Sequence, residues 1–213
     1  MRRTWLLSVL IPVSLLFLPA CGKGPLSFFE PSYKSQDDCG FVQNVYGERI
    51  SWKGKTPVRL YIHQSFPPEF LGSLQSAIQK WEQSAGKPLF QIVATNVAGP
   101  LNPRQDGTNM IYYMNTWEPD RKNEQARTSV YWVGDEIREA DIRINAYNFT
   151  FFSTTPNAAS DVHIESLLIH ELGHVLGLKH KDGAGSVMAT YLASATFRNL
   201  VPTSDIQDLR CEY

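Results

Sequence analysis

The stretch His-Glu-Leu-Gly-His-Val-Leu-Gly-Leu-Lys-His at residues 170–180 determines how the rest of this sequence is interpreted. His170 and His174 are four residues apart, so a helix would place both imidazoles on one face, about one turn apart. His180 follows six residues later, which in a continued helix would add about 9 Å of rise and about 240° of rotation. We therefore expect the helix to end at Gly177, because glycine tolerates the positive φ that a sharp exit needs.

Three imidazoles brought together in this way predict a site for one catalytic Zn²⁺ ion, with His170, His174 and His180 as ligands. Three nitrogen ligands leave the fourth position of a tetrahedral zinc ion open, which is the arrangement of catalytic sites rather than structural ones. Glu171 would stand beside the ion without ligating it, in the position of a general base and acid. Two alternatives remain open, namely a helix that merely contains histidines and a protein that binds zinc without turnover.

The pattern H-E-x-x-H-x-x-G-x-x-H resembles the zinc motif of the metzincin metallopeptidases, which carry a methionine-containing turn downstream. The segment Ser186-Val187-Met188 resembles that turn, and Met188 would form an apolar floor under the imidazoles. Residues 77–82 and the strand candidates around 126–128 and 140–145 are similar to small bacterial matrixins within this family. The resemblance covers most of the chain and implies a zinc-dependent endopeptidase that acts on proteins or peptides. Calcium is not indicated, since the calcium and structural zinc loops of animal matrixins have no counterpart.

The residues around the methionine depart from the larger subfamilies. Lys181 after the third histidine fits none of the large groups, and no proline follows Met188. Tyr191 lies three residues after Met188, whereas astacin-like relatives place a tyrosine two residues after it. We expect Tyr191 to line the substrate pocket, with direct assistance at the zinc as the alternative. The subfamily and the cleavage preference stay open.

Apolar periodicity predicts an α+β fold. Strands are expected at residues 58–63, 89–94, 110–114, 128–133 and 140–145. Helices are expected from Pro67-Pro68 to Ala85, through the zinc motif with Asp161 as N-cap, and from about Ser204. This order is similar to that of metzincin catalytic domains. It implies a twisted five-stranded mixed sheet with two long helices, a Met-turn and a C-terminal helix.

The same resemblance implies that one edge strand of the sheet binds the substrate backbone in antiparallel fashion. Thr128 to Val133 is the best candidate for that strand. Two further histidines, His63 at a strand end and His163 before the zinc helix, are interpreted as solvent-facing or capping residues rather than ligands.

The first twenty residues predict an export signal. Arg2 and Arg3 precede an apolar stretch, residues 5–18, that is too short to span a bilayer comfortably. The following Leu-Pro-Ala-Cys resembles the lipobox of bacterial lipoproteins, in which Cys21 would carry the lipid. We therefore expect a signal peptide at 1–20, a lipidated tether at 21–38, and a catalytic domain at 39–213 held to a bacterial envelope membrane. A twin-arginine signal and an uncleaved anchor helix remain as alternatives.

The other two cysteines bracket the predicted domain. In an exported chain, Cys39 and Cys211 predict a disulfide that joins the two ends of the domain. The alternative is that Cys39 caps the zinc, as the cysteine switch of matrixin zymogens does. Removal of residues 1–20 takes away two of the 20 basic residues and none of the 21 acidic ones, so the net charge becomes −3. No basic patch argues for nucleic acid, and we expect a monomer.

Overall fold

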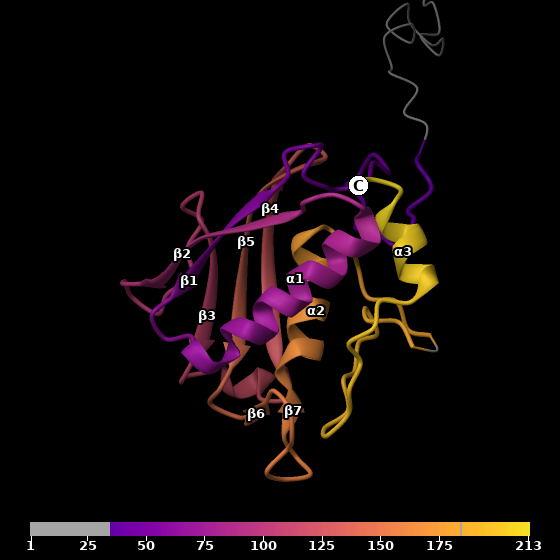
Figure 1. Ribbon diagram of the computed structural model, residues 1–213. Coiled ribbons are helices and arrows are strands. Elements are labelled where there is room, and N and C mark those ends of the chain that lie inside the picture. Colours follow the sequence, from indigo (N-terminus) through magenta and orange to yellow (C-terminus); the bar gives the residue numbers. More distant parts are fainter. Residues whose placement is uncertain (1–34, 184) are drawn as a thin grey trace, which may run out of the picture. The chain divides into compact units, whose positions relative to one another are not determined.

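The computed structural model describes residues 35–183 and 185–213 (Figure 1). The signal peptide at 1–20, the lipidation at Cys21 and most of the tether lie outside these residues and stay predictions. Within the described ranges, no helix combines the length and the apolar character needed to cross a membrane.

A mixed five-stranded sheet forms one layer of the fold. Its strands are β1 (Val58–His63), β2 (Phe90–Val97), β3 (Asn109–Met114), β4 (Ala126–Val133) and β5 (Glu136–Asn145). They lie in the order β2-β1-β3-β5-β4, and all neighbours are parallel except β4, which is antiparallel to β5. The five predicted strands and the mixed sheet are confirmed. β5 begins four residues earlier than expected. Its first residues are mostly polar and do not show the apolar pattern of a strand, but they pair with β4 directly after the turn at Gly134.

Two helices cover the same face of this sheet (Figure 1). They are α1 (Leu71–Ala85), which follows the short helix η2 (Pro68–Phe70), and α2 (Ile164–Val175). Gly86 ends α1 in a left-handed conformation with φ 70°, so the helix stops at Ala85 as predicted. Trp81 of α1 is fully buried and donates a hydrogen bond from Nε1 to the Ile169 carbonyl in α2, 2.9 Å away. This contact fixes the active-site helix against the first helix.

Smaller elements complete the domain. They are η3 (Pro119–Arg121), a two-stranded sheet of β6 (Phe151–Phe152) and β7 (Val162–His163), and α3 (Thr203–Leu209). The C-terminal helix α3 is anchored near the end of α1, where Arg210 donates from Nε to the Ser84 carbonyl at 3.3 Å. The predicted fold class, an α+β domain with two long helices and a third near the end of the sequence, is confirmed.

Three local predictions are wrong. Asp161 does not cap α2, because the helix begins at Ile164 without a side-chain cap. Its carboxylate instead accepts hydrogen bonds from the backbone amides of Asn157 (2.8 Å) and Ala158 (2.9 Å) in the preceding loop. His63 and His163 are buried rather than solvent-facing, and both ring nitrogens of each have hydrogen-bond partners. His163 stands at the N-cap position of α2, but its side chain makes no capping hydrogen bond. A single sequence does not show that these imidazoles end inside the core.

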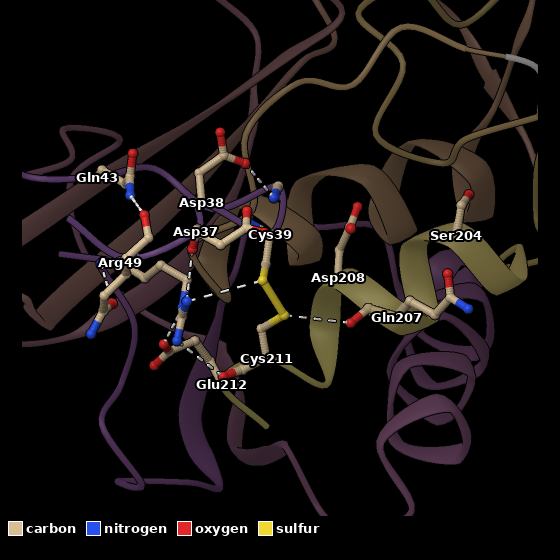
Figure 2. The surroundings of a disulfide bond; sticks show 12 residues. Asp37, Asp38, Cys39, Gln43, Arg49, Ser204, Gln207, Asp208, Cys211 and Glu212 are labelled. Atoms are coloured by element: carbon tan, nitrogen blue, oxygen red, sulfur yellow. Dashed lines mark hydrogen bonds and ion pairs between the residues drawn. A yellow bond between two sulfur atoms is a disulfide. The ribbon is translucent and has the colours of Figure 1, made fainter. Parts of the chain in front are cut away.

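The predicted disulfide between Cys39 and Cys211 is present and spans 172 residues of sequence (Figure 2). It joins the segment before β1 to the second residue after α3. Arg49 lies beside it and donates to Glu212 at 2.5 Å and to the Asp37 carbonyl at 2.7 Å. Because the sulfur of Cys39 is bonded to Cys211, the alternative of a zinc-capping Cys39 is not observed.

Candidate metal centre and substrate cleft

Helix α2 places the first two histidines of the motif. Their Nε2 atoms are 3.1 Å apart, on adjacent turns of one helix. The Nδ1 atom of His170 lies 2.8 Å from the Val187 carbonyl, and that of His174 lies 2.7 Å from the Leu178 carbonyl. Each Nδ1–H therefore has a backbone acceptor, which fixes the ring and leaves Nε2 free to bind a metal.

The chain leaves the helix at Gly177, where φ is +100°. A Cβ atom at this position would overlap the Ile50 carbonyl oxygen and come within 3.3 Å of the Phe41 ring. Glycine is thus required here for two reasons: the backbone has a positive φ, and the neighbouring segment leaves no room for a Cβ atom. The predicted helix break has two causes, of which only the first is visible in the sequence.

The turn brings His180 to the other two histidines. One ring nitrogen from each of the three residues lies within 4.8 Å of the others. The ring centroid of His180 is 5.2 Å from that of His170 and 4.7 Å from that of His174. Burial lowers the pKa of His170 to about 3, with a further contribution from His174, and burial also lowers the pKa of His174 and His180. Three neutral imidazoles at this spacing fit a zinc ion.

Glu171 is buried beside this cluster. Its Oε2 atom accepts a hydrogen bond from the Thr128 hydroxyl at 2.6 Å. Burial raises the pKa of Glu171 to about 7, while the bond from Thr128 opposes the rise. Thr128 lies on β4, the strand that the sequence analysis selected as the substrate-binding edge, but its bond to the carboxylate was not foreseen.

Met188 packs against the zinc helix α2, and its role as an apolar floor under the imidazoles stays a prediction. It is 2% exposed, and its sulfur is so close to Gly173 of α2 that a Cβ there would collide with it. Asp205 of α3 stabilises the turn at Met188. Its carboxylate accepts hydrogen bonds from the Ser186 hydroxyl (2.9 Å) and the Val187 amide (2.8 Å). Since Val187 also accepts from His170, buried Asp205 supports a ligand indirectly, and sequence reasoning missed it.

A cleft of about 680 Å³ opens over these residues. The alternate residues Thr128, Val130 and Trp132 of β4 line one wall. Tyr191 lines the cleft with a side chain that is 73% exposed, and its part in a substrate pocket stays a prediction. Arg198 also lines the cleft and was not singled out by the sequence. β4 is an edge strand, so its outer backbone is open to a further strand along this wall.

In a comparison with protein-family models, the matrixin model matches residues 23–213. The chain belongs to the matrixin family. It is therefore a zinc-dependent metalloendopeptidase, and its substrates are proteins or peptides. A comparison with curated proteins gave no significant match.

Proposed function

We propose that this matrixin cleaves peptide bonds with Glu171 as general base and acid, beside a zinc ion held by His170, His174 and His180. The observation that carries the proposal is the buried Glu171 carboxylate, which Thr128 holds next to the three imidazoles inside the cleft. A carboxylate that is both buried and directed in this way can take and return a proton near neutral pH.

The substrate backbone would add to the sheet along β4, antiparallel to that strand, with main-chain hydrogen bonds. A bound zinc ion would supply an acidic water and polarise the scissile carbonyl. Glu171 would accept the proton from the attacking water and deliver it to the leaving amine. Thr128 would keep the carboxylate oriented toward the imidazoles throughout, since its hydroxyl occupies Oε2.

The protein would act from a bacterial envelope, as a monomer tethered by a lipid on Cys21. Support comes from the basic and apolar residues at 2–18, the cysteine that follows them, and the disulfide that suits an oxidising compartment. Mass spectrometry of the mature N-terminus tests the anchor. A diacylglyceryl mass on Cys21 is expected, and an N-terminus at any other residue would contradict it.

Replacement of Glu171 by Gln tests the catalytic role. The variant should keep its zinc and lose about 10³-fold or more in kcat, because Gln has similar size but cannot accept the proton. Zinc content is measured by metal analysis, and cleavage is measured with a broad library of unfolded peptides. Equal inactivity of wild type and variant, with zinc bound in both, would favour a non-catalytic zinc-binding protein or an enzyme restricted to one substrate.

A further inference from the structure

The cleft contains two arginines, and their surroundings differ. Arg127 is paired with Glu124 in a two-pronged contact, with Nε to Oε2 at 3.0 Å and Nη2 to Oε1 at 2.6 Å. Arg198 has no carboxylate of the described residues within ion-pairing distance. Asp205 and Asp182 act on its charge only from beyond that distance, so Arg198 lacks the direct carboxylate partner that Arg127 has.

Arg198 is also incompletely hydrogen-bonded. Nη1 donates to the Tyr191 carbonyl at 2.8 Å and Nη2 donates to the Ala189 carbonyl at 3.1 Å. Nε is buried and has no partner among the described residues. A guanidinium has five N–H donors in a fork that matches a carboxylate, so several donors remain for a ligand.

The backbone of Arg198 is fixed at one end of the cleft. The Arg198 amide donates to Ser166 Oγ at 2.8 Å, one helical turn before His170. Gln125, just before β4, donates to the Leu192 carbonyl at 2.9 Å, so the loop that carries Arg198 adjoins the start of β4. Trp132, near the other end of β4, therefore lies at the opposite end of the cleft.

A peptide antiparallel to β4 would run from Trp132 past Thr128 toward Ala126. Its residues before the scissile bond would lie near Trp132 and Val42, where the wall is apolar. Its first residue after the scissile bond would lie beyond the Thr128–Glu171 contact, at the end where Leu167, Leu192 and Arg198 line the cleft. Two aliphatic walls with a guanidinium suit a side chain that has a short apolar stem and a negative end.

We propose that Arg198 is a specificity-determining residue, and that this peptidase prefers substrates with a carboxylate side chain directly after the scissile bond. This inference rests on the proposed function, because it takes the cleft to hold a peptide antiparallel to β4. It adds a substrate class, acidic at one position, to the general peptidase activity of the family.

Binding of short peptide hydroxamates tests the preference without turnover. The hydroxamate chelates zinc and so fixes the register, while the adjoining side chain is Glu, Gln, Leu or Lys. Zinc-loaded wild type should bind the Glu compound about tenfold or more tightly than the Leu or Lys compound, as expected for a charged hydrogen bond. Arg198→Gln should abolish this ratio, Arg198→Lys should restore part of it, and Arg198→Glu should favour the Lys compound.

The same experiment distinguishes specificity from support of the loop. Arg198 also donates hydrogen bonds to the carbonyls of Ala189 and Tyr191, so its removal alone can weaken the binding of every compound. An equal loss for all four side chains in Arg198→Gln, or a wild-type preference for Leu, would overturn the inference. Arg104→Gln is the matched control, since it removes one exposed positive charge outside the cleft and should leave the ratio unchanged.

Different experimental outcomes would refute the proposed function and the proposed role of Arg198. Cleavage of peptides without any acidic preference would leave the peptidase function and refute the role of Arg198. Acidic preference in hydroxamate binding, together with a Glu171→Gln variant that cleaves peptides as fast as wild type, would leave the specificity of the cleft and refute the catalytic role of Glu171. Thermal unfolding and zinc content of each Arg198 variant show whether it is folded before its ratio is interpreted.

Discussion

The two sides of the metal centre are held in different ways. His170 and His174 belong to one helix that is packed against α1 in the core, so their spacing is set by local geometry. His180 follows a turn that is held by segments distant in sequence. Phe41 forms a β-bridge with Leu178, and the Val42 amide donates to the Gly177 carbonyl at 2.9 Å.

The last residues of the sequence support the same turn. The Tyr213 hydroxyl donates to the Leu176 carbonyl at 2.7 Å, and Glu212 accepts from Arg49 and Ser51 of the segment before β1. Figure 2 shows how the Cys39–Cys211 disulfide ties these two segments together. Two ligands thus depend on the helix, whereas the third depends on contacts between the beginning and the end of the domain.

Loss of the disulfide should have the largest effect on this comparison. Cys39→Ser together with Cys211→Ser should lower the free energy of unfolding by about 2–5 kcal/mol, because the open chain gains conformational freedom. Zinc should also be released faster, because the turn before His180 loses part of its support. Urea unfolding and zinc transfer to a chelating dye measure the two effects. Unchanged zinc release in a less stable variant would show that the disulfide does not support the third ligand.

Gly177→Ala should act directly on the turn. The positive φ costs about 1–2 kcal/mol for a residue with a Cβ, and overlap with the Ile50 carbonyl adds about 1–3 kcal/mol. Gly54→Ala is the control, since its φ is +79° but no atom lies within 4 Å of a Cβ there. Calorimetry should show the larger loss at Gly177, with zinc binding weakened in that variant alone. Equal losses would mean that the close approach of Ile50 is unimportant.

Asp141→Asn should change stability without affecting either group of ligands. Burial raises the pKa of Asp141 from its ordinary value of 3.8 to about 7, so the folded state binds a proton that the unfolded state has lost. Stability should therefore fall as the pH rises from about 4 to 7 and stay low above it. Asn keeps the acceptor for the Met110 amide and should raise the free energy of unfolding by about 1–2 kcal/mol at pH 8.

Asp161→Asn should change the free energy of unfolding in the opposite direction. Its hydrogen bonds with Thr150, Ala158 and Asn157 lower the pKa of Asp161, so its contribution is present above the unfolded pKa and lost in acid. This variant should be less stable than wild type at pH 8. Denaturant unfolding across the pH range, with zinc release measured in parallel, would contradict the assignment if both variants shifted stability in the same direction.

Tyr213→Phe should have the smallest effect. It removes one hydroxyl that bridges the Leu176 carbonyl and the Trp52 amide, at a cost of about 1 kcal/mol. Zinc release should become slightly faster, because the bond to Leu176 holds the end of α2 from which the turn starts. Tyr147→Phe, at a side chain that is 64% exposed, is the control and should change neither quantity.

Local sequence patterns were sufficient for much of the fold. The spacing of His170 and His174 reflects helix geometry, and the strands follow apolar and β-branched periodicity. Gly177 predicts a positive φ, and Cys39 and Cys211 at the ends of the domain predict a disulfide. Each of these features depends on neighbours along the chain or on a count, so no knowledge of packing was needed.

The supporting residues could not be recognised in this way. Thr128, Asp205 and Arg198 are ordinary polar residues in the sequence, and their roles arise only when β4, α3 and the loop after the Met-turn meet α2. His63 and His163 were misread for the same reason. The sequence by itself determined a metal site with three histidines and a carboxylate on an α+β domain. Only the tertiary structure decided what holds that carboxylate, what holds the third histidine and which charge faces the substrate, because those contacts join residues far apart in the chain.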